Sequence, residues 1–143
     1  MGLVDIRSKI KTKLESRQGD GEPLVDVFDS HKTGFNGYPS ATFEPSEVQS
    51  DYETNTQNMR KYTFRIVIHQ EIEKVTRSRA IDILCDALDT LMDDFDRDDT
   101  LGGSADMCRA IPLAWGIYDE GAGLVMYAEM KFEADKSIDL ISN

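Results

Sequence analysis

The spacing of apolar residues along the chain predicts two helices. One apolar stripe with spacings of three and four predicts a helix over about 3–17 and consists of Leu3, Ile6, Ile10 and Leu14. A second stripe with the same periodicity predicts a helix over about 77–97 and consists of Ala80, Ile81, Leu84, Leu88, Leu91, Met92 and Phe95. Either Thr76 or Ser78 can cap the start of the second helix, and two glycines follow its end.

Alternation of apolar and polar residues predicts strands in most of the remaining chain. The clearest strand covers residues 61–72, a short β-branched strand covers 24–28, and residues 40–44 between two prolines suit a sheet edge. Two strands joined by a turn at 119–123 close the chain. In the first of these, one face is expected to hold Met107, Ile111, Leu113, Trp115 and Ile117, interrupted by Arg109. In the second, one face is expected to hold Leu124, Met126, Ala128, Met130, Phe132 and Ala134.

This element order, α-β-(β)-β-α-β-β, predicts an α+β fold. We expect a single mixed or antiparallel sheet of four to five strands, with two helices packed on one face. A doubly wound nucleotide-binding fold is excluded, because the chain lacks alternating β-α units and a glycine-rich turn between strand and helix. The length corresponds to a single domain, 1–143.

The segment from about 46 to 60 departs from both periodicities. Its only apolar residues are Val48, Tyr52 and Met59. A loop of this length within a small domain is either disordered or functional. We therefore predict a functional polar loop or extended arm at about 46–60.

The charge balance narrows the class of partner. The chain has 27 acidic and 16 basic residues, which gives a net charge of −11. Binding to nucleic acid or to an anionic membrane is disfavoured, because both depend on a surplus of Lys and Arg. The longest apolar run, 110–118, contains Pro112 and Gly116 and is too short to span a bilayer.

No pattern typical of catalysis, metal binding or cofactor binding occurs. The alternating aspartates at 94–98 lack the glycine and the glutamate that an EF-hand loop requires. The two histidines lack metal-ligand spacing, and we expect His69 to be exposed on the polar face of its strand. We expect Cys85 and Cys108 to be buried free thiols. The sequence thus favours a protein that is not an enzyme and that uses no metal and no cofactor.

Charge is distributed unevenly along the chain. Residues 1–17 have a net charge of +3, whereas residues 76–143 have a net charge of −9. One interpretation is a pair of solvated helix faces, and the other is that opposite faces of identical subunits pair head to tail in a ring. The basic face would then comprise Lys9, Lys11 and Lys13. The acidic face, at a lumen or between subunits, would comprise Asp82, Asp86, Asp89, Asp93 and Asp96.

Two passages of the sequence resemble a known family. Residues 37–47, GYPSATFEPSE, and residues 54–68, TNTQNMRKYTFRIVI, resemble tail terminator (tail completion) proteins of long-tailed bacteriophages. The Asp-rich helix, the segment AIPLAWG at 110–116 and the final strand with alternating Glu and Lys extend this resemblance over nearly the whole chain.

The resemblance implies a structural virion protein with an α+β fold that assembles as a ring, in that family a hexamer. Such a ring caps the tail tube at its head-proximal end, joins the tube to the neck proteins of the head, and lets DNA pass without specific binding. An acidic lumen would repel DNA. The implied partners are further copies of the chain, the tail tube protein and the head-completion protein, in the virion tail after assembly in the host cytoplasm. Interface residues on the polar segment would be Tyr52, Asn55, Asn58 and Arg60.

Two alternatives remain open at this point. The first is another phage neck or tail-tube component of similar fold, and the second is a small acidic cytoplasmic binding or adaptor domain without catalysis. A tube subunit polymerises into long cylinders, a terminator stops at one ring, and an adaptor domain stays monomeric.

Overall fold

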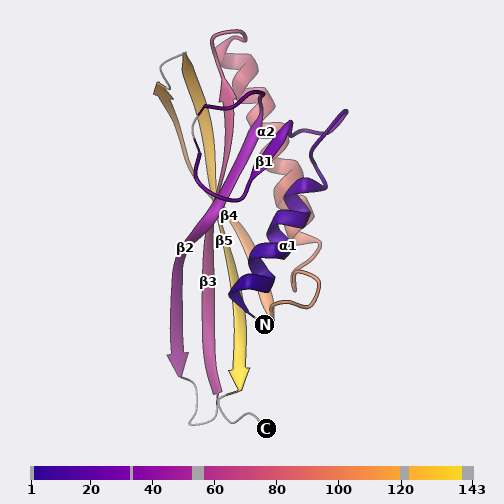
Figure 1. The fold of residues 1–143 in the computed structure, drawn as a ribbon, viewed down its shortest axis with the longest axis vertical. Coiled ribbons are helices and arrows are strands. Elements are labelled where there is room, and N and C mark those ends of the chain that lie inside the picture. Colours follow the sequence, from indigo (N-terminus) through magenta and orange to yellow (C-terminus); the bar gives the residue numbers. More distant parts are fainter. Residues whose placement is uncertain (1, 33, 53–56, 120–122, 140–143) are drawn as a thin grey trace.

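The polypeptide forms one five-stranded sheet that is covered on one face by two helices (Figure 1). The structure is a computed structural model that describes residues 2–32, 34–52, 57–119 and 123–139. In chain order the elements are α1 (Leu3–Glu15), β1 (Asp26–Phe28), β2 (Ser40–Tyr52), β3 (Gln57–Glu71), α2 (Arg77–Asp96), β4 (Met107–Asp119) and β5 (Leu124–Asp139). The predicted α+β class and the predicted order of elements are confirmed.

The strand order in the sheet is β1-β2-β3-β5-β4. Only β1 is parallel to its neighbour, and the other three pairings are antiparallel, so the sheet is mixed. The pairing of β3 with β5 is the longest and runs without a shift from Gln57 opposite Asp139 to Glu71 opposite Val125. The turn predicted between the last two strands includes residues 120–122, which lie outside the described residues.

Both helices bury most of their predicted apolar stripes against the sheet, but Ile81, predicted on the stripe of α2, is 39% exposed. The buried positions on α1 are Ile6, Ile10 and Leu14, and those on α2 are Ala80, Leu84, Ala87, Leu88, Leu91 and Phe95. They pack on the alternate residues of β3 and β5 that face the helices, as the contact between the rings of Phe95 and Phe132 at 4.7 Å illustrates. Within the described part of the chain, no helix is both long enough and apolar enough to cross a membrane.

Within the polar segment predicted at 46–60, residues 46–52 and 57–60 are strands and not a loop, which corrects one form of that prediction. Strands β2 and β3 continue through it, in register from Gln49 opposite Lys61 to Tyr52 opposite Asn58, with residues 53–56 outside the described part. Both faces of these strands are polar, so the sequence contains no alternation that could identify them. Pairing with β5 on the far side of β3 keeps the segment extended.

The expectation that β4 presents one continuous apolar face is wrong. A bulge between Pro112 and Trp115 places one extra residue opposite β5. Before the bulge the buried Cys108 faces the helices, whereas after it Trp115 and Ile117 are on that side. The five residues expected on one face are therefore divided between the two faces, and most of β4 is exposed because it is an edge strand.

A bidentate ion pair joins the two helices. Arg17, just beyond α1, donates from Nε and Nη2 to the two carboxylate oxygens of Asp94 on α2, at 2.7 and 2.9 Å. These hydrogen bonds lower the pKa of Asp94, because they stabilise the charged carboxylate. Asp94 is on the last turns of α2, where the helix dipole disfavours a negative charge, so the guanidinium offsets this cost.

We predict that Asp94→Asn lowers the midpoint of thermal unfolding at pH 7, because it removes the charge that Arg17 binds. A group whose folded pKa is lowered stabilises the fold above its ordinary pKa of 3.8 and loses that contribution as the pH falls through the folded value. The difference from wild type should therefore shrink below about pH 4. Asp96→Asn is the matched control, since Asp96 is exposed on the same helix; equal effects of the two variants would contradict the prediction.

Candidate interaction surfaces

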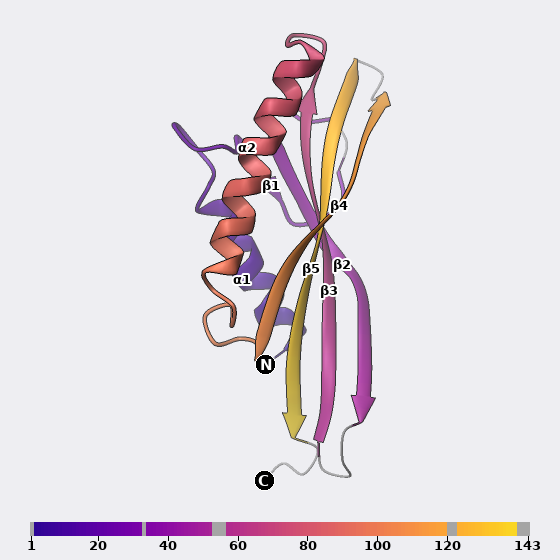
Figure 2. The same cartoon turned by 180° about the vertical axis from the view of Figure 1, so that it is seen from behind.

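The sheet extends beyond its helices as a three-stranded arm, which we define as residues 46–52, 57–61 and 135–139. In Figures 1 and 2 the ends of β2, β3 and β5 project past the first turn of α1 with no helix over them. The reason is length: twenty helical residues span about 30 Å, whereas fifteen extended residues span about 50 Å. No helix packs on this part of the sheet, which is held by backbone pairing and by a few polar side-chain contacts such as that between Asn58 and Ser50.

The four interface residues predicted on the arm do not form one exposed surface among the described residues. Asn58 is 1% exposed and donates through Nδ2 to the hydroxyl of Ser50, so it is not on the surface of the isolated chain. Its Oδ1 atom is buried and has no hydrogen-bond partner among the described residues. Arg60 is half-buried, only the backbone of Tyr52 is described, and Asn55 lies outside the described residues.

Two basic side chains are neighbours on the arm. Arg60 is directly opposite Lys136 in the pairing of β3 with β5, so the two side chains share one face. Lys136 approaches Asp106 at 4.0 Å, and no described residue forms an ion pair with Arg60. Like charges directly opposite each other are destabilising, which favours a partner that supplies carboxylates.

The three lysines predicted as one basic interface on α1 have different surroundings. Lys13 bonds within the chain, to the carboxylate of Asp98 at 3.2 Å, and Lys11 is 3.5 Å from the carboxylate of Asp29. Lys9 is exposed. Part of the basic charge of α1 therefore neutralises acidic residues of the same subunit and is not available to another one.

The five aspartates predicted as an acidic face do form one surface. They are all exposed along the outer side of α2, and none of them forms an ion pair with another described residue; they are Asp82, Asp86, Asp89, Asp93 and Asp96. Residues three and four apart share a helix face, so the like charges repel one another. We call this surface the acidic stripe.

A buried polar cluster on the opposite face of the sheet corrects the expectation for His69. Its side chain is 4% exposed, and the ring contacts Phe35 at 4.7 Å between centroids. The two ring nitrogens lie 3.0 Å from the hydroxyl of Thr42 and 2.9 Å from that of Tyr118. Burial lowers the pKa of His69 to about 4, with smaller contributions from the charges of His31 and Arg65.

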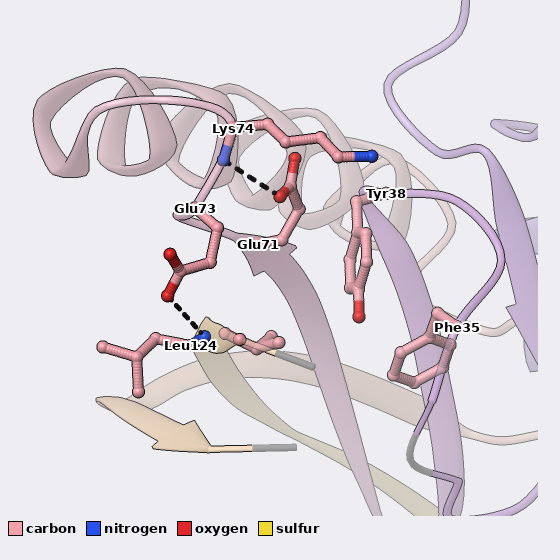
Figure 3. A pocket seen from close by; sticks show the side chains of 8 residues that line it. Phe35, Tyr38, Glu71, Glu73, Lys74 and Leu124 are labelled. Carbon is pink, nitrogen blue, oxygen red and sulfur yellow. Dashed lines mark hydrogen bonds between the residues drawn. The ribbon is translucent and has the colours of Figure 1, made fainter. Parts of the chain in front are cut away.

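A small pocket of about 180 Å³ lies where β3 leads into α2 (Figure 3). Two carboxylates line it beside the rings of Phe35 and Tyr38, but both accept backbone hydrogen bonds. Glu73 accepts from the amide of Leu124 at 3.1 Å and Glu71 from that of Lys74 at 3.3 Å. The first bond connects the turn after β3 to the start of β5, and the second lies within that turn, so both carboxylates have a structural role.

A second hollow, of about 410 Å³, lies between the first half of α2 and the edge strand β4. It is lined by Arg77, Ile81, Cys85, Trp115, Gly116, Ile117 and Met126. Cys85 is exposed here, contrary to the expectation that it is buried, whereas Cys108 is buried as expected. Sequence reasoning missed this groove, although a proline and a glycine beside the only tryptophan are a signal of an irregular edge strand.

Among residues 2–32, 34–52, 57–119 and 123–139, no group of three or more His, Cys, Asp or Glu side chains is arranged to hold a metal ion. No protein-family model matches the sequence, and no curated protein matches it significantly. The function is therefore inferred from the geometry of these surfaces.

We predict that the buried neutral His69 makes the fold sensitive to mild acid. A group whose folded pKa is lowered below its unfolded value of 6.5 stabilises the fold above that value and loses this contribution as the pH falls toward 4. The free energy of unfolding should fall by about 2 kcal/mol between pH 7 and pH 5. His69→Asn should remove this dependence in chemical denaturation, and His31→Asn should retain most of it, because burial lowers the pKa of His69 more than the charge of His31 does. An equal pH dependence in wild type and His69→Asn would contradict the prediction.

Proposed function

We propose that this protein is a tail terminator of a long-tailed bacteriophage. It forms a ring of identical subunits, six as in the family that it resembles, which caps the tail tube at its head-proximal end and joins it to the neck proteins. The protein then belongs to the tail of the virion and assembles in the host cytoplasm. It acts through surfaces and not through catalysis.

The observation that carries this proposal is the uncovered arm. Its strands continue well beyond the helical layer, yet they bury little apolar surface there, so folding alone does not account for their length. Arg60 and Lys136 place two basic groups opposite each other on the helix-facing side of the arm, although the arm as a whole has three basic and four acidic residues. These two groups suit a carboxylate on the tube or on a neighbouring subunit.

The resemblance falls on the same part of the molecule. Residues 40–47 of the first passage form the first half of β2, and residues 57–68 of the second form most of β3, so the passages include the β3 strand of the arm and residues 46–47 of its β2 strand. The acidic stripe fits a ring through which DNA passes, because unpaired carboxylates repel phosphate. It can face the lumen or an adjacent subunit.

The oligomeric state of the protein in solution tests whether it forms a ring. Gel filtration coupled to light scattering should give one closed species of six 16.1 kDa chains, roughly 97 kDa, whose mass does not grow with concentration. The measurement is repeated with polymers of the tube protein of the same phage, since a ring can require the tube end for assembly. Long cylinders would indicate a tube subunit instead, and a monomer under both conditions would indicate an adaptor domain.

Shortening the arm tests its role in docking. Gln49 and Lys61 are opposite each other in the sheet, so residues 50–60 can be replaced by Asn-Gly, a two-residue hairpin turn. We expect cooperative unfolding and ring formation to persist, because the buried helix-facing core lies outside the removed segment, and binding to tube ends in co-sedimentation to be lost. Undiminished tube binding by this variant would exclude the arm as the tube contact.

A further inference from the structure

The groove between α2 and β4 is an apolar surface that the fold of one subunit leaves open. Its walls are formed by large apolar side chains that remain substantially exposed: Trp115 at 43%, Ile81 at 39% and Ile117 at 37%. Scattered exposed apolar residues are ordinary, but these three converge on one hollow above Met126. A tryptophan in an apolar recess is typical of the centre of a protein–protein interface.

The acidic stripe runs along the same helix as one wall of this groove. Ile81 and Cys85 each precede an aspartate of the stripe, Asp82 and Asp86. The surface therefore has an apolar centre with an acidic border on α2, and Arg77 is at one end. Such a surface is complementary to a segment that combines an exposed apolar side chain with basic neighbours.

The chain itself carries a segment of this chemistry on α1. Val4 is 81% exposed, the highest exposure among the large apolar residues described. Arg7 lies three residues after Val4 and Lys11 seven residues after it, so the three side chains share one helix face. Both basic groups lie near the same carboxylate, Asp29, at 3.6 and 3.5 Å, and one acidic group cannot neutralise two basic ones.

The two surfaces are separate, although α1 and α2 cover the same face of the sheet (Figures 1 and 2). Helix α1 packs beside β1, the first strand of the sheet, whereas the groove borders β4, the last strand. A contact between them is therefore heterologous, since each subunit uses one surface for the copy before it and the other for the copy after it. Contacts of this kind close into rings when the rotation between neighbours allows it.

We propose that the groove formed by Ile81, Trp115 and Ile117 receives the Val4 face of α1 from a second copy of this chain. Val4 enters the apolar recess, and Arg7 and Lys11 approach the acidic stripe at Asp82 and Asp86. This pairing rests on the proposed ring, and within that ring it assigns the stripe to the contact between subunits.

Single substitutions on the two surfaces test the pairing. Trp115→Ser removes the aromatic side chain from the groove, and Val4→Glu places an acidic group on the opposite surface, in the first turn of α1 where a carboxylate is compatible with the helix dipole. Each should raise the concentration for half-assembly roughly tenfold or more. Met107→Ser is the matched control, because Met107 is exposed on the same strand but outside the groove, and it should assemble as wild type does.

Mixing the two variants tests whether the Val4 face of α1 is what occupies the groove. Each variant keeps one intact surface, so a mixture of the two monomers should form a 1:1 heterodimer of roughly 32 kDa that neither forms alone and that does not grow into a ring. Far-ultraviolet circular dichroism and cooperative unfolding verify that both variants are folded. A wild-type ring that Trp115→Ser leaves intact, or a mixture that stays monomeric, overturns this pairing while the terminator function stands. A wild-type chain that forms no ring, with or without tube ends, overturns the proposed function itself.

Discussion

The antiparallel register between β3 and β5 is the constraint on which the rest of the molecule depends. Fifteen consecutive pairs, from Gln57 opposite Asp139 to Glu71 opposite Val125, make these strands longer than the helices that cover them. At one end the sheet supports α1, α2 and a single apolar core. At the other end the strands continue as the uncovered arm, because their backbone hydrogen bonds do not require a packed side-chain layer.

The bulge in β4 has a comparable effect at the edge of the sheet. One extra residue between Pro112 and Trp115 reverses the direction of every later side chain in the strand. Tyr118 thereby reaches His69 on one face, while Trp115 and Ile117 reach the border of α2 on the other. A single change of register thus builds both the buried polar cluster and the apolar groove. Gly116 is part of the same arrangement, because a Cβ atom there would lie about 2.5 Å from the hydroxyl oxygen of Tyr127.

Some aspartates of this protein form ion pairs that stabilise the fold, whereas others have no ion-pair partner within the described chain. Arg17 and Lys13 satisfy Asp94 and Asp98 near the end of α2, where the helix dipole disfavours negative charge. No such partner within the described chain compensates the acidic stripe on the outer side of the same helix. The aspartates look equivalent in the sequence, and only the position of α1 distinguishes the two groups.

The sequence by itself determined the two helices, the α+β class and the order of elements. The periodicity of each helix and strand arises because one of its faces is buried against a neighbouring layer, and the buried positions are the apolar ones in the sequence. Tertiary structure alone decided that residues 46–52 and 57–60 extend the sheet, that His69 is buried and that Trp115 borders a groove. These features depend on pairing between distant strands and on a one-residue shift in an edge strand, and neither leaves a periodic signal along the chain.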